Sequence, residues 1–366
     1  MTHPRTLRAL ACCVAVAAVL ASCSDNKTKS GGATSSSAAV ATDRSRSDGA
    51  SGLSGSSAAS DNSGSSAGVN TSGPYAVGRR SVTFVDKTRI TNADPQRNLP
   101  ERPDRTLPVM LLYPATGPVD PEGAPADDAA PTTGRFPLVV FSHGITASGP
   151  VYTIMLQRWA RAGYVVAAPT FPLSGPGAKF PGDGVALADY NNQPADVSFV
   201  ISSVLAANGD SKDPLHGRID ARRIAAGGHS LGAITTLGLV YNSCCIDKRI
   251  KAAIEISGIE LPFKNGSFDN SPATPLLLVH GAKDNTVPIG GGSDAIFPKA
   301  KPPEYYLRYP AGSHISPIFS ASLEYTNAAA IAFLDATLKG EPKALQGIPE
   351  KVSASGGLAT WQPRPT

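Results

Sequence analysis

From about residue 74 to residue 340, short apolar runs alternate with segments in which apolar residues recur at helical spacing. The runs that we interpret as strands span residues 81–85, 107–113, 138–142, 164–168, 223–228, 252–257, 276–280 and 305–309. Later runs, such as 276–280, are almost continuously apolar, which is typical of strands covered on both faces of a sheet. We therefore expect these strands to form a central, mostly parallel sheet.

Segments of helical periodicity fill the intervals between these runs. Pro194 suits the first turn of a helix, and apolar residues then follow at helical spacing: Val197, Val200, Ile201, Val204 and Leu205. We predict further helices over residues 151–161, 231–241 and 323–338. The repeated strand–helix–strand order predicts a single three-layer α/β domain over residues 74–340. Residues 341–366 are rich in Pro, Gly and Ser, and we expect them to form a tail that wraps the surface.

The N-terminus has the pattern of an export signal. Arg5 and Arg8 precede an apolar run over residues 9–20, which is too short to span a bilayer. The run ends in Leu20-Ala21-Ser22-Cys23, which resembles a bacterial lipobox. We expect residues 1–22 to be removed as a signal peptide and Cys23 to become the lipidated first residue; a plain signal peptide cut nearby is the alternative. Both readings predict export, and the lipidated form is anchored in the membrane, facing the periplasm or the cell exterior.

The composition changes abruptly after Cys23. Ser, Gly and Ala account for 32 of the 50 residues from 24 to 73, and no aromatic residue occurs among them. Such a segment cannot bury enough apolar surface to fold. We interpret residues 23–73 as a lipidated cysteine followed by a disordered tether that lets the folded domain reach away from the membrane.

The charge balance gives no sign of a nucleic-acid partner. The chain has 33 Lys plus Arg against 29 Asp plus Glu, and removing Arg5 and Arg8 with the signal leaves 31 against 29, a net charge of +2. A binding surface for nucleic acid needs a far larger basic excess. With 41% hydrophobic residues, the chain can instead fill a sizeable core.

Cys244 and Cys245 are the cysteines that remain after export and lipidation. Their Cα atoms lie about 3.8 Å apart as chain neighbours, below the usual disulfide range, so a bridge needs a strained vicinal ring. We expect free thiols, with the vicinal disulfide as the alternative. Two adjacent cysteines without a second Cys or His pair do not make a tetrahedral metal site, so no metal is predicted.

The most specific chemical signal is Gly228-His229-Ser230-Leu231-Gly232, which lies between a predicted strand and a predicted helix. In this context the pattern G-x-S-x-G is a nucleophile elbow, a tight turn that leaves the Ser hydroxyl exposed. The glycines avoid a collision between positions on either side of the turn. The same pattern at Gly64-Ser65-Ser66-Ala67-Gly68 lies in the tether without a strand or helix, and we give it no role. Ser230 is the predicted nucleophile, and a buried turn serine is the alternative.

A serine nucleophile needs a base, and the base needs a third group that orients it. In this fold the acid and then the base follow the serine, each just past a strand. Asp284 and His314 meet both conditions, and we predict them as acid and base. His229 neighbours the nucleophile and is expected to point away from it, and His280 ends a strand too early. The competing acids that lack the expected position are Asp269, Asp294 and Asp335.

Acyl transfer also needs donors for the oxyanion that develops in the transition state. We predict the backbone N–H of Leu231, the residue after the nucleophile, as one donor. The second is the N–H of Ile145, in the loop Ser142-His143-Gly144-Ile145 that follows a predicted strand. We expect the His143 side chain to brace this loop without touching substrate.

Together these residues show a family resemblance. The chain is similar to secreted bacterial α/β-hydrolase esterases of the platelet-activating factor acetylhydrolase and polyester hydrolase group, which share the dienelactone-hydrolase layout. The supporting segments, which cover most of residues 75–338, are 105–108, 112–115, 136–144, 163–169, 228–232 and 249–254. The resemblance implies carboxylic-ester hydrolysis through an acyl-enzyme, with Ser230, Asp284 and His314 as the triad and no cofactor. Dienelactone hydrolases differ in having a Cys nucleophile.

Substrate preference is less determined by the sequence. A Gly- and Pro-rich stretch over residues 170–193 is expected to form a loop over the site, where Phe171, Phe180 and Tyr190 either line an acyl pocket or pin the loop. No large inserted cap is visible, which favours an open site and small-molecule or lipid-derived esters with short acyl chains. We also expect the enzyme to be a monomer. The same triad also serves thioesterases, amidases and peptidases, and a non-catalytic binding lipoprotein with a hydrolase fold is a further alternative.

Overall fold

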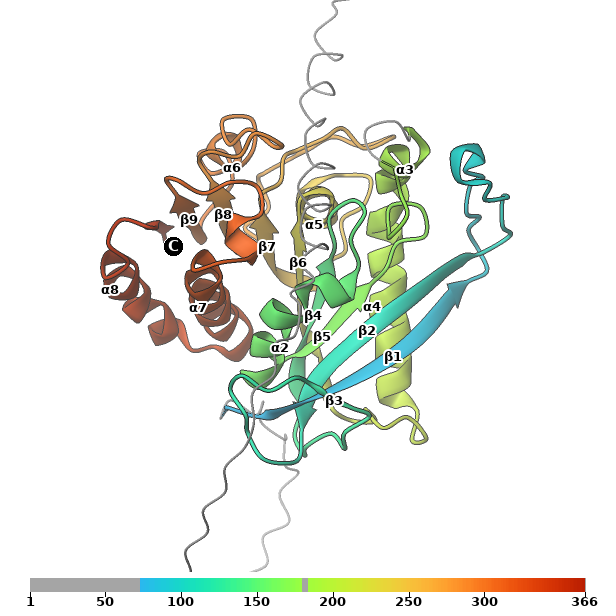
Figure 1. Cartoon of the computed structure of the whole chain (residues 1–366), viewed down its shortest axis with the longest axis horizontal. Helices are drawn as coiled ribbons and strands as arrows, with labels where there is room; N and C mark the ends of the chain where they lie inside the picture. Colours follow the sequence, from blue (N-terminus) through green and yellow to red (C-terminus); the bar gives the residue numbers. More distant parts are fainter. Residues whose placement is uncertain (1–72, 180–183, 366) are drawn as a thin grey trace, which may run out of the picture.

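A computed structural model of the chain describes residues 73–179 and 184–365. This part is built around a ten-stranded sheet in the order β10-β9-β8-β7-β6-β4-β5-β2-β1-β3 (Figure 1). The strands are β1 (Ala76–Asp86), β2 (Arg105–Ala115), β3 (Ala126–Asp127), β4 (Phe136–Ser142), β5 (Val165–Pro169), β6 (Ile219–His229), β7 (Ile250–Ile256), β8 (Leu276–Gly281), β9 (Glu304–Tyr309) and β10 (Thr360–Arg364). Strands β4 to β9 pair in parallel, and antiparallel pairs form at both ends of this central part.

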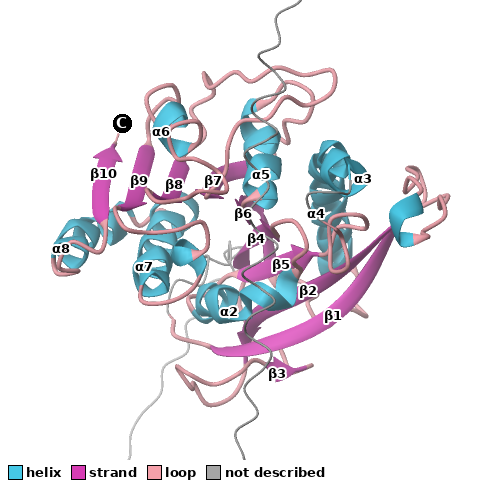
Figure 2. Ribbon diagram, turned by 45° about the horizontal axis from the view of Figure 1, so that its top comes forward, coloured by secondary structure: helices cyan, strands magenta, loops and turns pink. Residues whose placement is uncertain are grey.

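Helices cover both faces of the sheet (Figure 2). The α-helices among the described residues are α2 (Thr153–Arg161), α3 (Gly184–Ala188), α4 (Gln193–Gly209), α5 (Leu231–Tyr241), α6 (Ser293–Ile296), α7 (Ser322–Leu334) and α8 (Ile348–Ser353). Helices α2, α7 and α8 pack on one face, and α4, α5 and α6 pack on the other. The three-layer α/β fold predicted from the sequence is confirmed.

Strand β4 shows why its sequence is continuously apolar. All seven of its residues are buried. Val139 and Phe141 belong to the core cluster under α2 and α7, whereas Leu138 and Val140 belong to the cluster under α4 and α5. Successive side chains of a strand point to opposite faces, so a strand covered on both sides needs apolar residues at every position.

The residues after 340, which we expect to wrap the surface, also contribute a helix and an edge strand to the fold. Residues 348–353 form α8, and residues 360–364 form β10, which pairs antiparallel with β9 at the edge of the sheet. Trp361 stacks on Tyr305 with ring centroids 5.6 Å apart. The tail lacked a strand signal because β10 is an edge strand whose Pro363 breaks the apolar pattern, and edge strands tolerate proline.

The structure also differs from the sequence-based expectation at the paired cysteines. Cys244 and Cys245 form a vicinal disulfide, with Cα atoms 3.8 Å apart. They lie in a turn after α5, where the side chain of Asn242 accepts a hydrogen bond from the Cys244 N–H and the Asn242 carbonyl accepts one from Cys245. These bonds hold the two residues in a tight turn, which spacing alone could not reveal.

The predicted signal peptide, Cys23, the tether as far as residue 72, and Phe180 lie outside the described residues. Within the described ranges, no helix is long and apolar enough to cross a membrane.

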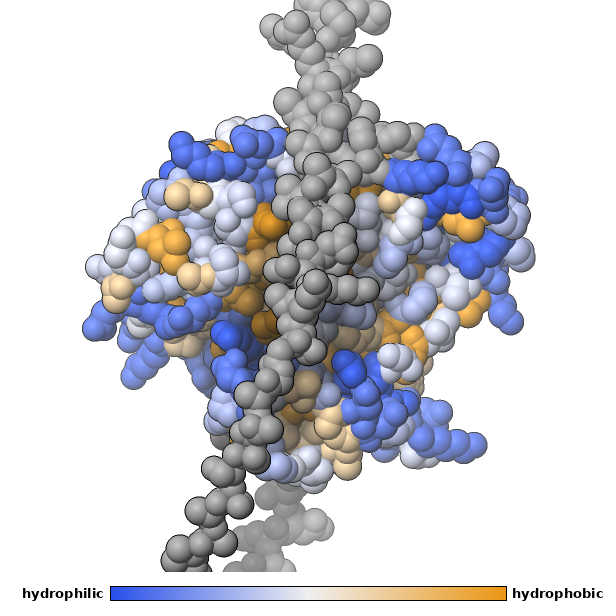
Figure 3. All heavy atoms as spheres, viewed as in Figure 1, coloured by the Kyte–Doolittle hydropathy of each residue, from blue (hydrophilic) through white to orange (hydrophobic). Residues whose placement is uncertain are grey.

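On the face shown in Figure 3, hydrophobic residues form small separate patches among hydrophilic ones.

Candidate active site

Ser230 sits at the turn between β6 and α5, in the backbone conformation that a nucleophile elbow requires. Its φ of 56° and ψ of −120° are strained for a residue with a side chain. A Cβ atom on Gly228 would lie 2.2 Å from the carbonyl oxygen of Gly232. The two glycines of the motif therefore allow the strand and the helix to meet, as the sequence predicted.

The predicted acid and the predicted base follow neighbouring strands at the same edge of the sheet. Asp284 follows β8 and His314 follows β9, whereas Ser230 follows β6. The carboxyl ends of parallel strands lie at one edge, which is where α/β proteins place their sites. The fold therefore brings together three residues that lie up to 84 positions apart in the chain.

Asp284 and His314 are hydrogen-bonded. The Nδ1 atom of His314 lies 2.7 Å from Oδ2 of Asp284, and both residues are buried. The other carboxylate oxygen, Oδ1, accepts the backbone N–H groups of Thr286 and Val287, each at 2.8 Å. Burial opposes the ionised form, but the hydrogen bonds from His280 and His314 outweigh it and hold the pKa of Asp284 well below its usual range. An ionised Asp284 fixes the tautomer of His314 that leaves Nε2 free to accept a proton.

Ser230 lies beside this pair without a direct bond to it. No described residue accepts or donates a hydrogen bond at the Ser230 hydroxyl. Its neighbour His229 contacts His314, with ring centroids 4.9 Å apart and Nε2 at 3.1 Å from the His314 carbonyl oxygen. In structures without substrate, catalytic hydrogen bonds are often long and tighten only in the reacting complex.

His229 does more than the sequence indicated. Tyr152 accepts the N–H of Gly144 at 3.0 Å and donates its own hydroxyl proton to His229 Nδ1, also at 3.0 Å. His229 Nε2 then donates to the carbonyl of His314. Burial lowers the pKa of His229 to about 3, so its ring is neutral, as this chain of donors requires. Sequence reasoning missed Tyr152, since nothing in its local pattern distinguishes it from a core tyrosine.

The loop after β4 lies over Ser230. A Cβ atom on Gly144 would come within 3.2 Å of the Ser230 Cβ. Within the described part of the chain, the backbone N–H groups of Ile145 and Leu231 donate to no acceptor. Both predicted oxyanion donors are thus available on segments that flank the nucleophile.

His143 braces this loop, as expected. Its Nδ1 lies 2.7 Å from the Gly144 carbonyl oxygen, and its Nε2 accepts the backbone N–H of Phe171 at 3.0 Å. Burial lowers the pKa of His143 to about 4, which keeps the ring neutral. Phe171 is buried in the core against the His143 ring, so it pins the segment that begins at residue 170.

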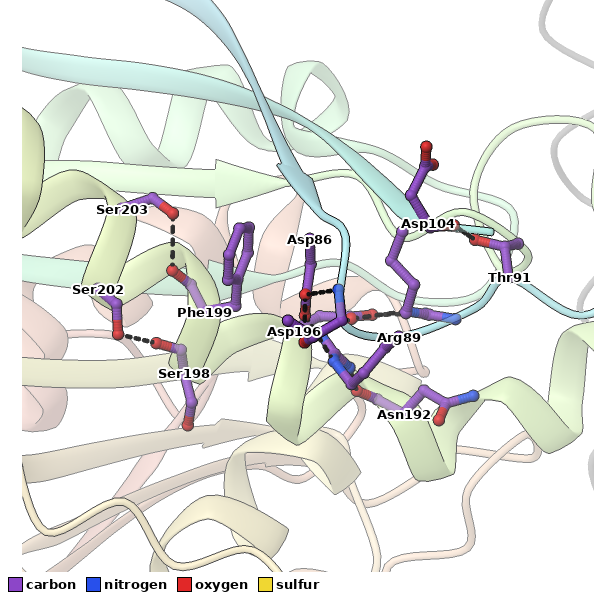
Figure 4. A network of polar contacts seen from close by, with 12 residues as sticks. Asp86, Arg89, Thr91, Asp104, Asn192, Asp196, Ser198, Phe199, Ser202 and Ser203 are labelled. Carbon is purple, nitrogen blue, oxygen red and sulfur yellow. Dashed lines mark hydrogen bonds and ion pairs between the residues drawn. The ribbon is translucent and has the colours of Figure 1, made fainter. Parts of the chain in front are cut away.

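A buried ion cluster holds the other end of that segment. Arg105 is fully buried and makes two-pronged contacts with Asp189 and with Asp196, at 2.6 to 3.0 Å. Arg89 reaches Asp196 at 2.7 Å, and the view of this network shows Arg89 beside Asp86 and Asp196 (Figure 4). The cluster connects the start of β2 to the start of α4, and it therefore fixes the position of residues 184–193.

An apolar cluster adjoins the oxyanion donors. Its buried members are Leu231, Ile234 and Phe263, and the half-buried residues packed against them include Ile145, Leu187, Tyr190 and Ile259. The Tyr190 ring packs on Phe263 with centroids 5.1 Å apart, and its hydroxyl donates to the carbonyl of Pro262. Tyr190 therefore pins its loop and also faces the apolar cluster beside the site.

His280 was set aside in the sequence analysis because it ends β8, but the structure places it against the predicted acid. Its Nε2 lies 3.1 Å from Oδ2 of Asp284. Its Nδ1 lies 2.8 Å from the hydroxyl of Ser293, which donates to Glu255 at 2.7 Å.

Among the residues that the structure describes, no group of three metal-ligating side chains could hold a metal ion.

Comparisons with known proteins agree with this architecture. A ferulic acid esterase from Streptomyces cinnamoneus has a similar structure, with a TM-score of 0.59 and 22% sequence identity over 81% of this chain and the whole of that chain. The fold is that of an α/β-hydrolase. The family described as platelet-activating factor acetylhydrolase, isoform II, matches residues 120–171 of this chain. That segment contains β4 and the loop over residues 142–145 with the predicted oxyanion donor Ile145 (below, the oxyanion loop). The predicted resemblance to this esterase group is confirmed there. A comparison with curated protein sequences finds no significant match.

Proposed function

We propose that the protein is a serine hydrolase that cleaves carboxylic esters through an acyl-enzyme. The observation that carries the proposal is the 2.7 Å contact between Asp284 and His314 beside the strained elbow of Ser230. The similarities to a ferulic acid esterase and to the acetylhydrolase family support the hydrolysis of esters. We expect small-molecule or lipid-derived esters with short acyl chains as substrates, because the sequence contains no large inserted cap over the site.

In this reaction Ser230 Oγ attacks the ester carbonyl carbon while His314 Nε2 takes the hydroxyl proton. The N–H groups of Ile145 and Leu231 stabilise the oxyanion. The carbon–oxygen bond to the alcohol then breaks, and His314 returns the proton to the leaving alkoxide. Water, deprotonated by His314, then attacks the acyl carbon, and the bond from this carbon to Ser230 Oγ breaks. The carboxylic acid leaves, and His314 returns the proton to Ser230 Oγ. Asp284 stays ionised and orients His314 throughout.

The test is to treat the full-length protein with a fluorophosphonate and to locate the adduct by peptide mass spectrometry. We expect one adduct, on Ser230, together with turnover of short-chain p-nitrophenyl esters. Ser230→Ala should lose both, with kcat lower by a factor of about 10³ or more. Ser257→Ala is the matched control, because Ser257 is buried and bonds the His314 carbonyl without being a predicted nucleophile. If the folded wild-type protein neither reacts with the fluorophosphonate nor turns over the esters, the esterase proposal is wrong and a binding role remains.

We also propose that the enzyme is exported and anchored by a lipid on Cys23. The support is the lipobox-like sequence Leu20-Ala21-Ser22-Cys23 behind a short apolar run. Cys23→Ser should move the protein from the membrane fraction to the soluble fraction of the producing bacterium. Unchanged fractionation of Cys23→Ser, beside a Cys244→Ser control, would exclude anchoring at this residue.

A further inference from the structure

A second histidine shares the carboxylate that orients His314. His280 is fully buried at the end of β8. Its Nε2 lies 3.1 Å from Asp284 Oδ2, the same oxygen that His314 contacts, and 3.0 Å from the carbonyl oxygen of Val287. Neither of these two oxygen atoms has a proton to donate when Asp284 is ionised, so Nε2 of His280 must carry the proton of the hydrogen bond.

The opposite nitrogen of His280 leads to a second carboxylate. Nδ1 lies 2.8 Å from the Ser293 hydroxyl, which donates to Oε2 of Glu255 at 2.7 Å. The other oxygen of Glu255 accepts the backbone N–H of Gly258. A carboxylate that accepts hydrogen bonds at both oxygens is arranged as an anion. Because Ser293 gives its proton to Glu255, its oxygen accepts one from Nδ1, and His280 then has protons on both nitrogens.

We propose that His280 is held as an imidazolium between Asp284 and Glu255, and that it acts as a positioning residue for the predicted base. Its cation lies against Oδ2 of Asp284 and offsets part of the charge that His314 faces. The imidazole of His314 therefore contacts a carboxylate whose charge is already partly balanced, and this balance affects how His314 accepts the Ser230 proton. This effect on rate rests on the proposed esterase function, whereas the charge of His280 does not.

The surroundings of His280 are consistent with one buried cation. The charged and titratable groups that face it are Asp284 from the loop after β8, Glu255 from β7, and His229 and His314 from beyond Asp284. Burial opposes a charged His280, but the hydrogen bond to Asp284 and the charges of Glu255 and Asp284 outweigh it and raise its pKa. Burial also raises the pKa of Glu255, and the charge of His280 with the donors from Ser293 and Gly258 acts against that rise.

Glu255→Gln is the variant that separates the two charge states. A Gln side chain can accept the Gly258 N–H at its oxygen and point its amide N–H₂ at Ser293. Ser293 then donates to Nδ1 of His280, which becomes neutral, and every group remains hydrogen-bonded. The variant removes the charge without opening a cavity. Glu304→Gln is the matched control, since Glu304 is another fully buried carboxylate on a strand and pairs with Arg364 at 2.7 Å.

The first measurement is the ¹⁵N NMR spectrum of histidine-labelled full-length protein, with the His280 signals assigned by comparison with His280→Gln. We expect both ring nitrogens of His280 to stay protonated in the wild type and in Glu304→Gln at pH values above the pKa of an ordinary histidine. In Glu255→Gln the Nδ1 proton should be lost near neutral pH. A neutral His280 ring in the wild type overturns the proposal, and this spectrum decides it even where Glu255→Gln does not fold.

The second measurement is the pH dependence of kcat/KM for a short-chain ester. In Glu255→Gln the acid limb should move upward by roughly half a pH unit to one unit, because His314 then faces an uncompensated Asp284. Glu304→Gln should keep the wild-type limb. An unshifted limb in a Glu255→Gln protein whose His280 has become neutral overturns the positioning role. A wild type with a charged His280 and no ester turnover would instead refute the esterase function and leave the charge assignment standing.

Discussion

Gly232 and Ser142 are packed backbone to backbone. A Cβ atom placed on Gly232 would lie 2.0 Å from the carbonyl oxygen of Ser142. Gly232 is in the first turn of the helix behind the nucleophile, and Ser142 ends β4, where the oxyanion loop begins. This contact joins the two segments that supply the predicted oxyanion donors, so their separation is fixed by main chain and not by side chains that can change rotamer.

Gly232→Ala should therefore destabilise the protein strongly. The added methyl group meets main-chain atoms that cannot move without displacing β4 or α5, and overpacking of this kind costs about 3 kcal/mol or more in the free energy of unfolding. Urea denaturation followed by circular dichroism measures the loss. The control is Gly209→Ala, because a Cβ there meets nothing within 4 Å, and its unfolding free energy should change by less than about 1 kcal/mol. Equal stability of the two variants would contradict the close packing.

Tyr152→Phe should reduce catalysis more than it reduces stability. The variant removes the hydroxyl that accepts the Gly144 N–H and donates to His229, and so loosens the oxyanion loop against the elbow. We expect kcat to fall by about tenfold with little change in KM, and the free energy of unfolding to fall by about 1–2 kcal/mol. Ester kinetics and thermal denaturation measure the two effects.

Tyr241→Phe is the control for Tyr152→Phe. The Tyr241 hydroxyl is bonded at 2.9 Å to the carbonyl of Thr274, in a fully buried side chain that does not touch the site. Its removal should cost a similar free energy of unfolding. A tenfold loss of kcat in both variants would show that general loosening, and not the oxyanion loop, explains the effect.

Much of this architecture could be predicted from the sequence because it follows from local patterns. The apolar runs identified the eight strands that carry or flank the site, and the elbow motif located Ser230 together with the segment where its partners should follow. The roles of Tyr152, His280 and Glu255 could not be predicted, since each depends on contacts between residues distant in the chain. A buried histidine at the end of a strand has the same local sequence whether or not it lies against the carboxylate of Asp284. Strand β10 was missed for the opposite reason, because an edge strand lacks the apolar pattern of a central one.

The stability of the protein should fall as the pH drops from about 6.5 toward about 4. In the folded state burial lowers the pKa of His143 to about 4 and that of His229 to about 3. The unfolded chain therefore takes up protons at these histidines first, so the stability that they contribute is complete above their unfolded pKa and is lost below it. Each histidine contributes a slope of up to about 1.4 kcal/mol per pH unit within this window. Urea denaturation at a series of pH values measures the slope.

His143→Gln isolates one of the two contributions. The amide can replace both hydrogen bonds of the ring but takes up no proton, so the slope between about pH 6.5 and pH 4 should fall by about 1 kcal/mol per pH unit. His216 lies exposed in a loop, and His216→Gln should keep the wild-type slope. A wild-type slope in His143→Gln would show that this ring is not held neutral by burial.

Arg105→Lys should strongly lower the free energy of unfolding, although it keeps the positive charge at this position. Arg105 uses its planar fork to bond two buried carboxylates, Asp189 and Asp196, and an ammonium group cannot bond both in the same way. Leaving these carboxylates partly unpaired in a buried site should lower the free energy of unfolding by about 3 kcal/mol. Arg79 and Asp127 form a pair with the same two-pronged geometry, but this pair is exposed. Because exposed ion pairs contribute little, Arg79→Lys should lower the free energy of unfolding by well under about 1 kcal/mol. Limited proteolysis near residue 184 should also be faster in Arg105→Lys, because the cluster holds this segment in place. If the two variants unfold at the same urea concentration and are cut at the same rate, the ion cluster does not anchor the loop over the site.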